Sequence, residues 1–506
     1  MTGNILTTVI VFIGYLGLMI CIGAYFYKSN NSIKDYVLGG RQLSPWTAAL
    51  SAQASDMSGW LLMGLPGTAY LVYGGTAEAI WTAIGLALGT YLNWLIVAKR
   101  LRKYTQIAKD SVTLPNFFKN RFHDESGILL GVCAIFTLLF FLFYTASMFN
   151  AGAKLFSTAF GIEYGVALVI GTLVIVCYTF LGGFLAVCWT DVIQGLLMFV
   201  ALIITPIVAM SKAGGSEAVS QLLNDAAQGA SFTFLPHTAT GGIAVLTLIS
   251  AIAWGLGYFG QPHILPRFMA LRNSKDVRPA RIIAMIWVVI SLGCAVVIGT
   301  IGSGMYPGLD DPETILMVMQ QDVFPPILAA IFLTAILAAI MSTADSQLLV
   351  VSSAISSDIY GGMINKKADQ KKLLWVGRLS VIFVSIIAAL LVSQPEAAEG
   401  TIMYKINESV FKLVAFAWGG FGASFGPLML FSLFWKRTTK PAAIAGVIVG
   451  GVTALIWWLL DGGIFDVYEI VPGFLFSSIV IVVISLLTKV PQEVIDEFES
   501  VKTSEF

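Results

Sequence analysis

Charged side chains are scarce in this sequence. Asp, Glu, Lys and Arg make up 11% of its 506 residues, whereas hydrophobic residues make up 57%. A soluble globular domain carries about 25% charged residues, so the composition argues against a soluble enzyme or binding domain. The formal net charge is zero, which gives no electrostatic signature of nucleic-acid binding.

Cysteine and histidine are also few. The five cysteines stand inside apolar runs without C-x-x-C spacing, and the three histidines stand far apart in polar connections. We therefore predict neither a disulfide framework nor a metal centre, and we interpret the histidines as solvated or capping. We find no nucleophile–base constellation in the sequence and therefore do not predict an enzyme. The first basic residue is Lys28, so residues 5–27 lack the basic start of a signal peptide and are expected to be a retained span.

Apolar runs long enough to cross a bilayer recur from residue 5 to residue 488. With about 20 residues required per span, we predict an all-α polytopic membrane protein with thirteen helices, near residues 5–27, 46–72, 76–98, 127–150, 163–183, 189–210, 241–262, 281–303, 325–358, 374–393, 407–434, 441–460 and 471–488. The clearest connectors are the polar stretches 99–109, 267–281 and 365–372. Residues 1–490 are expected to form one transmembrane domain, and 491–506 a short, partly helical cytoplasmic tail.

Lysine and arginine are sorted between the two sets of connecting loops. With thirteen spans, 25 of them fall on one side, and Lys154, Lys212, Lys405 and Lys412 fall on the other. Cytoplasmic loops carry the excess of basic residues. We therefore expect a multi-pass protein of the cell membrane, in contact with lipid, with its N-terminus outside and its C-terminus in the cytoplasm.

Two of the apolar segments are interrupted at their centres, at residues 54–59 and 254–262. Non-helical backbone at membrane depth is tolerated only beside a cavity or a bound polar species, and matching interruptions in two halves of a chain mark a transporter's binding site. The interruptions fall in spans 2 and 7. Five spans per repeat invert the second copy, so spans 2–6 and 7–11 are predicted to be inverted repeats.

The first interruption contains Asp56 between Ser55 and Ser58. A carboxylate at the centre of a membrane helix is unfavourable unless it faces a polar interior, which makes Asp56 a candidate functional residue. The alternative is structural, with Asp56 paired to Arg41 or capping the broken backbone.

The ninth span places Ala339, Ser342 and Thr343 on one helix face. Hydroxyl and carbonyl oxygens suit a hard monovalent cation such as Na⁺, and the first interruption frees carbonyls near Ala54 and Met57. The alternative is that these hydroxyls bond back to their own helix. Asp191, Asp345 and Ser346 could form a second cation or proton site, or Asp191 and Asp345 could serve as structural caps or hydrated gate residues. Glu408 and Lys412 are expected to form a structural i, i+4 pair.

The second interruption carries Trp254 and Tyr258 one turn apart, followed by Pro262, which ends the helix hydrogen-bond ladder. We predict that both aromatic side chains line a pocket for a compact solute with an apolar body.

These motifs resemble the sodium/solute symporter family, and within it the sodium/proline symporter branch. The resemblance rests on ASDMSGWLLMGLPG (54–67), AWGLGYFGQPH (253–263), RFMA (267–270), AAIMST (338–343), AGAKLF (151–156) and GGFLAVCWTD (182–191). It implies a leucine-transporter-like fold. The pair Asp345–Ser346 departs from the pattern of some relatives, which leaves the number of coupled ions open.

The resemblance also implies roles for individual positions. It implies that Na⁺, the co-transported ion, binds the carbonyls of Ala54, Met57 and Ala339 and the hydroxyls of Ser342 and Thr343. It implies that L-proline contacts Ser58, Gly59, Tyr144, Trp254, Tyr258 and Pro262, and that Asp56 takes part in coupling. We expect Na⁺-coupled proline import by alternating access, with no obligatory protein partner. The alternatives are a relative that carries pantothenate, a monocarboxylate or a sugar, and a membrane sensor or channel.

Overall fold

The computed structural model describes residues 2–27, 33–71, 75–181, 183–226, 233–237 and 242–503, which are almost wholly helical. Lys28, Gly182, residues 504–506 and the ends of two predicted spans at residues 72 and 241 lie outside this part. The longer helices are α1 (Thr2–Tyr27), α3 (Pro45–Asp56), α5 (Gly75–Leu92), α8 (Ile128–Phe160), α9 (Tyr164–Leu181), α10 (Phe184–Lys212), α14 (Val277–Met305), α16 (Pro326–Ser353), α17 (Gln370–Leu391), α19 (Val410–Phe434), α20 (Lys440–Leu459) and α21 (Ile470–Leu487).

Shorter helices connect or interrupt the long ones. They are α2 (Ile33–Leu38), η1 (Gly39–Arg41), η2 (Trp60–Gly64), α4 (Leu65–Tyr70), η3 (Asn93–Val97), α6 (Ala98–Ile107), α7 (Leu114–Arg121), α11 (Ser216–Ala226), α12 (Val245–Ala253), η4 (Trp254–Gly260), α13 (Leu265–Met269), η5 (Ser274–Asp276), η6 (Pro312–Thr314), α15 (Ile315–Val323), η7 (Ala354–Ile364), α18 (Ile402–Asn407), η8 (Gly463–Asp466) and α22 (Gln492–Thr503).

All thirteen predicted spans fall on helices, but not all are continuous. Within the described residues, ten helices are long and apolar enough to cross a membrane by length and composition. The other three predicted spans are shorter apolar stretches. The second is broken between α3 and α4, and the fifth and seventh keep apolar stretches of only Tyr164–Cys177 and Val245–Gly260. The count of thirteen spans and the inverted repeat stay predictions.

The predicted connector at 99–109 is helical over most of its length. It is the helix α6, which continues α5 through the π-turn η3. Leu101 and Tyr104 of α6 are buried, so the helix is stabilised by packing. Hydropathy marks only the lipid-facing apolar part of a helix and misses an amphipathic extension of this kind. The connector near 365–372 is confirmed in part, because η7 ends at Ile364 and α17 begins at Gln370.

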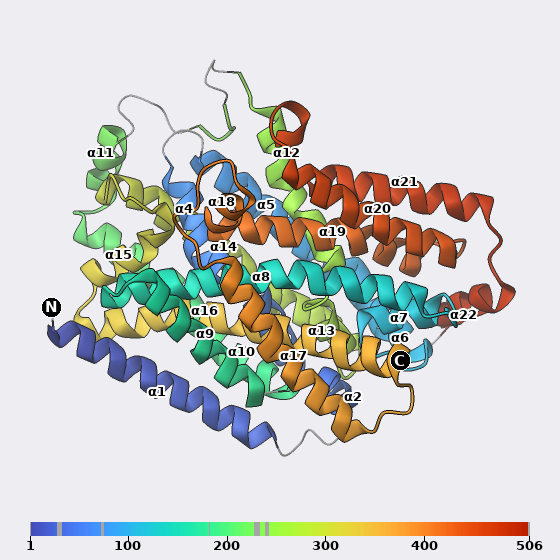
Figure 1. The fold of residues 1–506 in the computed structure, drawn as a ribbon. Helices are drawn as coiled ribbons and strands as arrows, with labels where there is room; N and C mark the ends of the chain where they lie inside the picture. Colours follow the sequence, from blue (N-terminus) through green and yellow to red (C-terminus); the bar gives the residue numbers. More distant parts are fainter. Residues whose placement is uncertain are drawn as a thin grey trace.

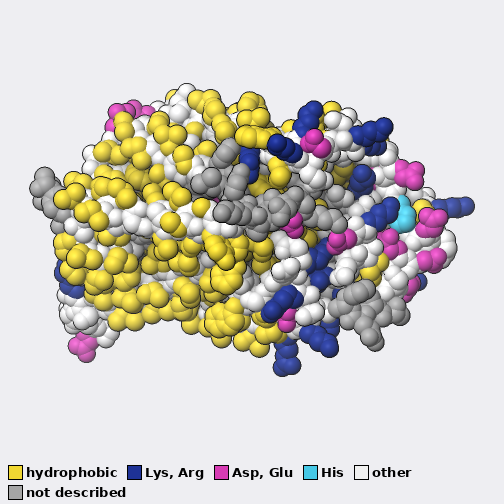
Figure 2. All heavy atoms as spheres, turned by 90° about the horizontal axis from the view of Figure 1, so that it is seen from below, with side chains coloured by type: hydrophobic (Ala, Val, Ile, Leu, Met, Phe, Trp, Pro, Cys, Tyr) yellow, Lys and Arg dark blue, Asp and Glu magenta, His cyan; other side chains and the backbone are white. Residues whose placement is uncertain are grey.

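The surface is divided into a hydrophobic band and a basic end. Figure 2 shows hydrophobic side chains over most of one face, with Lys and Arg gathered towards the right. The helix α1 begins at the left of Figure 1, whereas α22 lies at the right. Phe498 of α22 is buried and packs against Tyr104, so this part of the tail is docked on the helical body.

The two interrupted segments lie inside the helical body. Helix α3 packs against α10, α14 and α16, while η4 packs against α5 and α19. In the most apolar stretch of the continuous helix formed by α16 and η7, 83% is buried inside the protein. The protein interior therefore surrounds both interruptions, as non-helical backbone at membrane depth requires.

Candidate ion and substrate site

The first interruption begins where α3 ends. Ser44 caps the start of α3 by accepting a hydrogen bond from the Thr47 amide at 3.1 Å, and Pro45 follows at the first turn. The helix stops at Asp56, and Met57 takes φ −86° and ψ 80°, outside the helical region. The chain resumes as a π-turn at Trp60. The Ser58 amide donates to the Asp56 carbonyl at 3.1 Å, so the Ala54 carbonyl lacks its helical partner.

The predicted Na⁺ ligands meet at this point. The Ser342 hydroxyl of α16 donates to the Ala54 carbonyl at 2.6 Å, and the Thr343 hydroxyl lies 3.4 Å from the same oxygen. Ser342 also lies 3.1 Å from the Ala339 carbonyl. Four of the five predicted ligands thus converge across 288 residues of sequence. Met57 is buried beside them, although none of the described hydrogen bonds joins its carbonyl to this group.

Asp56 connects the two interruptions. The Tyr258 hydroxyl donates to Asp56 Oδ2 at 2.7 Å, while Asp56 Oδ1 is buried without a hydrogen-bond partner among the described residues. The Asp56 carbonyl accepts from Trp60 Nε1 at 2.9 Å and lies 3.5 Å from the Tyr144 hydroxyl. Asp56, Tyr144 and Tyr258 therefore form one buried cluster with a free carboxylate oxygen.

The alternative pairing of Asp56 with Arg41 is wrong. Arg41 Nε lies 2.9 Å from Asp110 Oδ1, and its Nη1 donates to the Met269 carbonyl at 2.7 Å. Arg41 thus holds the connection before α3 to the segments near residues 110 and 269. Asp56 is therefore hydrogen-bonded to Tyr258 and is not paired with Arg41.

The second interruption is an aromatic cluster. Trp254 stacks on Phe411 with ring centroids 4.9 Å apart and lies 5.3 Å from the Tyr468 ring. Trp418 Nε1 donates to the Trp254 carbonyl at 2.9 Å. A Cβ on Gly257 would lie 1.9 Å from that indole nitrogen, so only glycine admits this contact.

The other predicted substrate residues lie on either side of the buried cluster. Ser58 is fully buried, and its hydroxyl oxygen is 3.4 Å from the Trp60 amide. A Cβ on Gly59 would meet the Ala151 side chain at 3.1 Å, so Gly59 allows α8 to approach closely. Pro262 lines a different hollow from Trp254. The predicted set therefore does not line one pocket.

Trp254 faces a wide cavity of about 670 Å³. Seven carboxylates and two lysines line it: Glu78, Asp311, Glu313, Glu408, Asp461, Asp466, Glu469, Lys405 and Lys412. Both lysines are engaged, with Lys412 paired to Glu408 as predicted and Lys405 2.7 Å from Asp461. The wide cavity is acidic, and its floor is aromatic.

The predicted second cation group is built around an arginine. Arg267 Nη2 lies 2.6 Å from the Ser346 hydroxyl and 3.4 Å from Asp191 Oδ2. Ser51 donates to the same Asp191 oxygen at 2.6 Å. Asp345 lies beside Ser346, with its Oδ1 3.4 Å from that hydroxyl. A guanidinium thus lies among the side chains proposed for a cation.

Arg267 is a residue that sequence reasoning placed wrongly. The sequence predicts Arg267 to be one of the basic residues of the connector at 267–281, but it is 1% exposed. Its Nη1 also donates to the His263 carbonyl. The proximity of Arg267 to the second interruption was the available signal, because an arginine at membrane depth is retained only when it is paired.

His263 also differs from its interpretation as a solvated or capping residue. It is fully buried, with its ring edge-on to Tyr144 at 5.7 Å and to Phe141 at 5.6 Å. Neither ring nitrogen has a hydrogen-bond partner among the described residues. Its imidazole therefore acts as an aromatic packing group beside the tyrosine cluster.

Comparison with known proteins decides the family. The model of the sodium:solute symporter family matches residues 36–450. The chain belongs to this family. The symporter is 44% identical to a sodium/proline symporter of Salmonella typhimurium, covering 96% of this chain and 94% of that protein. It is 43% identical to an osmoregulated proline transporter of Bacillus subtilis, covering 94% of each chain.

Solved structures agree on the fold. A Na⁺-coupled sialic acid symporter matches this symporter with a TM-score of 0.75 at 22% identity, covering 95% of this chain and 98% of the other. The transporter MhsT matches with a TM-score of 0.51 at 14% identity, covering 88% and 98%. The predicted leucine-transporter-like fold is confirmed, and the symporter is a multi-pass membrane protein rather than an enzyme.

One carboxylate of the wide cavity leads to a prediction about stability. Glu469 immediately precedes α21 and is 9% exposed, and burial raises its pKa to about 7. Folding is then less favourable as the pH rises from the ordinary value of 4.5 through 7. A difference of this size corresponds to roughly 3 kcal/mol. We expect Glu469→Gln to raise the unfolding temperature in detergent at pH 8.5 and to change it little at pH 4.5.

The matched control is Glu399→Gln, which neutralises an exposed carboxylate before α18 and should leave the unfolding temperature unchanged at both pH values. An equal effect of Glu469→Gln at both pH values would contradict the assignment to ionisation.

Proposed function

We propose that this symporter carries L-proline together with Na⁺ into the cell by alternating access. The observation that carries the proposal is the convergence of the Ser342 and Thr343 hydroxyls on the Ala54 carbonyl, at the end of a broken helix. Neutral oxygens of this kind bind a monovalent ion and can still release it. The names of the proline-transporting relatives supply the solute.

Sodium would bind the carbonyls of Ala54, Met57 and Ala339 and the hydroxyls of Ser342 and Thr343. These ligands come from both α16 and the end of α3, so the ion would stabilise one arrangement of the interruption. Proline would bind next to it, against Ser58, Gly59, Tyr144, Trp254, Tyr258 and Pro262. If the ion-bound form binds solute more tightly, then solute must tighten ion binding by the same factor.

The two hollows support alternating access. The wide cavity reaches Trp254 from one side, whereas Pro262 lines a narrow pocket of only about 20 Å³ on the other. Lys405 and Lys412, two of the four lysines predicted on the outer side, line the wide cavity, and a third, Lys154, pairs with Glu313 of its lining. We infer that the wide cavity faces the outside, with the N-terminus outside and the C-terminus in the cytoplasm of a cell-membrane protein. Residues 1–490 would form its single transport domain.

Proteoliposomes test this function directly. Labelled proline should accumulate above its equilibrium level when an inward Na⁺ gradient is imposed, and not with a K⁺ gradient. Excess pantothenate, lactate or glucose should not compete, since such competition would favour the family's other solutes. Equilibration without accumulation would indicate a channel.

Removal of one proposed ion ligand should change the ion requirement. We expect Ser342→Ala to raise the Na⁺ concentration for half-maximal uptake roughly tenfold, because loss of one ligand contact weakens binding by about 1.4 kcal/mol. The measurement is initial proline uptake against Na⁺ concentration. Thr334→Ala is the control, since its hydroxyl bonds to its own helix at Ala330. An unchanged Na⁺ requirement in Ser342→Ala would remove this residue from the ligand set.

Removal of the aromatic side chain that Trp254 presents to the wide cavity should weaken the binding of proline rather than the binding of Na⁺. We expect Trp254→Ala to raise the KM for proline roughly tenfold, because a packed aromatic wall is lost. The half-saturating Na⁺ concentration should change much less. Trp189→Ala, at a tryptophan that is 48% exposed, serves as the control. Equal KM values for Trp254→Ala and the wild type would exclude Trp254 from the solute site.

A further inference from the structure

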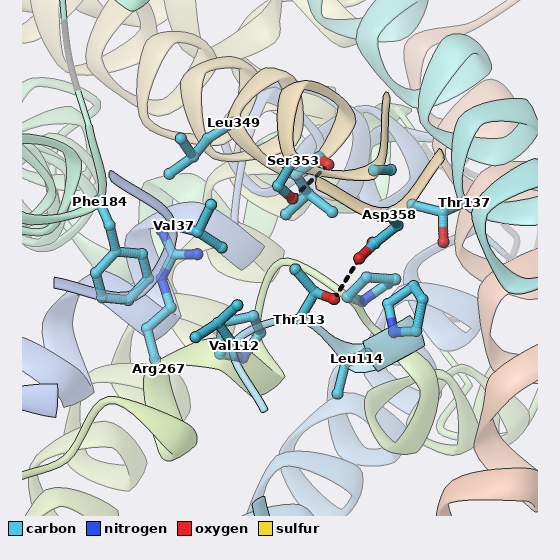
Figure 3. Close-up of a pocket in the computed structure, with 15 residues that line it drawn as sticks. Val37, Val112, Thr113, Leu114, Thr137, Phe184, Arg267, Leu349, Ser353 and Asp358 are labelled. Atoms are coloured by element: carbon cyan, nitrogen blue, oxygen red, sulfur yellow. Dashed lines mark hydrogen bonds between the residues drawn. The ribbon is translucent and has the colours of Figure 1, made fainter. Parts of the chain in front are cut away.

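The narrow pocket holds polar groups that the transport site does not use. Its volume of about 20 Å³ is room for about one water molecule or one alkali-metal ion. Figure 3 shows Arg267 at one end of the pocket, and Thr113, Asp358 and Thr137 at the other.

Asp358 is the central group of that second end. It lies in the π-helix η7 and is 1% exposed. Thr113 donates to its Oδ1 at 2.9 Å, while Oδ2 is buried without a hydrogen-bond partner among the described residues. π-Helical segments occur frequently at functional sites.

A second oxygen without a partner comes from another helix. Thr137 of α8 is fully buried and lines the same pocket, and its hydroxyl has no hydrogen-bond partner among the described residues. Thr113 is already fixed, because its hydroxyl also accepts from the Asn116 amide at the start of α7 at 3.1 Å. Thr113 therefore orients the Asp358 carboxylate and leaves Oδ2 directed elsewhere.

Asp358 forms no ion pair among the described residues, and Lys119 acts on its carboxylate only from beyond salt-bridge distance. Within the described part of the chain, no Lys or Arg nitrogen forms a salt bridge with it, and Arg267 is committed to Asp191 and Ser346. A buried ionised carboxylate is strongly unfavourable unless a cation compensates it. One carboxylate with neutral hydroxyls matches a single positive charge, and oxygen ligands suit hard cations.

We propose that Asp358 Oδ2 and Thr137 Oγ1 bind one Na⁺ ion, with Thr113 as the positioning residue. Asp358 follows Thr343 by 15 residues along α16 and η7, roughly 20 Å, so this site is separate from the Ser342 group. Leu114 and Pro115 of α7 line the pocket, and α7 lies at the right of Figure 1, the side on which Lys and Arg gather in Figure 2. This inference rests on the proposed function. The site holds Na⁺ on its way from the transport site to the cytoplasm.

Direct ion binding tests the site without transport. Binding of ²²Na⁺ to purified protein in detergent should fall by about one ion per chain in Asp358→Asn. Thr137→Val, which removes the hydroxyl at nearly constant volume, should weaken the same binding several-fold, and Thr137→Ser should restore it. Unchanged binding in Asp358→Asn and Thr137→Val would overturn the proposal. If Asp358→Asn does not fold, the comparison of Thr137→Val with Thr137→Ser decides alone.

The sidedness of transport separates an ion site from a merely structural contact. In vesicles of each orientation, Thr137→Val should raise the half-saturating Na⁺ concentration several-fold when Na⁺ is supplied on the side of the basic end. When Na⁺ is supplied on the opposite side, the concentration should stay unchanged. Equal changes from both faces would overturn the proposal. Absence of Na⁺-driven uptake in the wild type would instead contradict the proposed function, while the ²²Na⁺ measurement would still stand.

Discussion

Asp56→Asn is expected to lower Na⁺-driven proline uptake about 100-fold, which corresponds to roughly 2.7 kcal/mol. The asparagine oxygen can still accept the hydrogen bond from Tyr258, so the shape of the cluster is kept. What disappears is the negative charge on a fully buried side chain, beside the proposed Na⁺ ligands at Ala54 and Met57. Initial rates of labelled proline uptake under a fixed Na⁺ gradient measure the loss.

A second variant separates the charge from the hydrogen bond. Tyr258→Phe removes the donor at 2.7 Å from Asp56 Oδ2 and keeps the carboxylate. We expect a smaller loss, on the order of tenfold, because one hydrogen bond to a charged group contributes about 1.5 kcal/mol. A loss in Tyr258→Phe as large as that in Asp56→Asn would place the main effect in the hydrogen bond. Near-normal uptake in Asp56→Asn would show that the charge is not required.

The interruptions could be predicted because their signals are local. Apolar length, the glycines around Trp254 and the proline at 262 all act within a few residues. The meeting of Ala54 with Ser342 is different, because 288 residues separate them. The residue types predict only that freed carbonyls and hydroxyls share an ion. The individual ligands follow from the resemblance to the family, and the structure brings the Ser342 hydroxyl to the Ala54 carbonyl.

Arg267 and His263 show why the rest could not be predicted. Both follow a proline that breaks a helix, where sequence normally indicates a solvated connection. The burial of each residue depends on which segments pack over the connection. The partners of Arg267, which are Ser51, Asp191 and Ser346, come from three distant segments of the sequence. A count of basic residues per loop treats Arg267 like any surface arginine. Arg121 and Arg102, which belong to the same count, are also buried, and the sidedness that the count predicts stays a prediction.

Arg267→Met is expected to destabilise the protein by roughly 3–5 kcal/mol, because it leaves the Asp191 carboxylate buried without its cation. Asp191 is fully buried, and its Oδ1 already has no hydrogen-bond partner among the described residues. Asp191→Asn should also destabilise, since it leaves the guanidinium unpaired. The double variant should be more stable than Arg267→Met alone, because neither charge then remains. Unfolding temperatures in detergent for the four proteins give the coupling between the two residues.

The same four proteins distinguish an ion pair from a second Na⁺ site. If Asp191 serves mainly to hold Arg267, the half-saturating Na⁺ concentration of the folded variants should follow that of the wild type. If Asp191, Asp345 and Ser346 bind a second cation, Asp191→Asn should raise that concentration without lowering the unfolding temperature. The 3.4 Å approach of Arg267 to Asp191 Oδ2 favours the ion pair, because the guanidinium already supplies the positive charge that a cation would bring. Additive stability losses in the double variant would contradict this coupling.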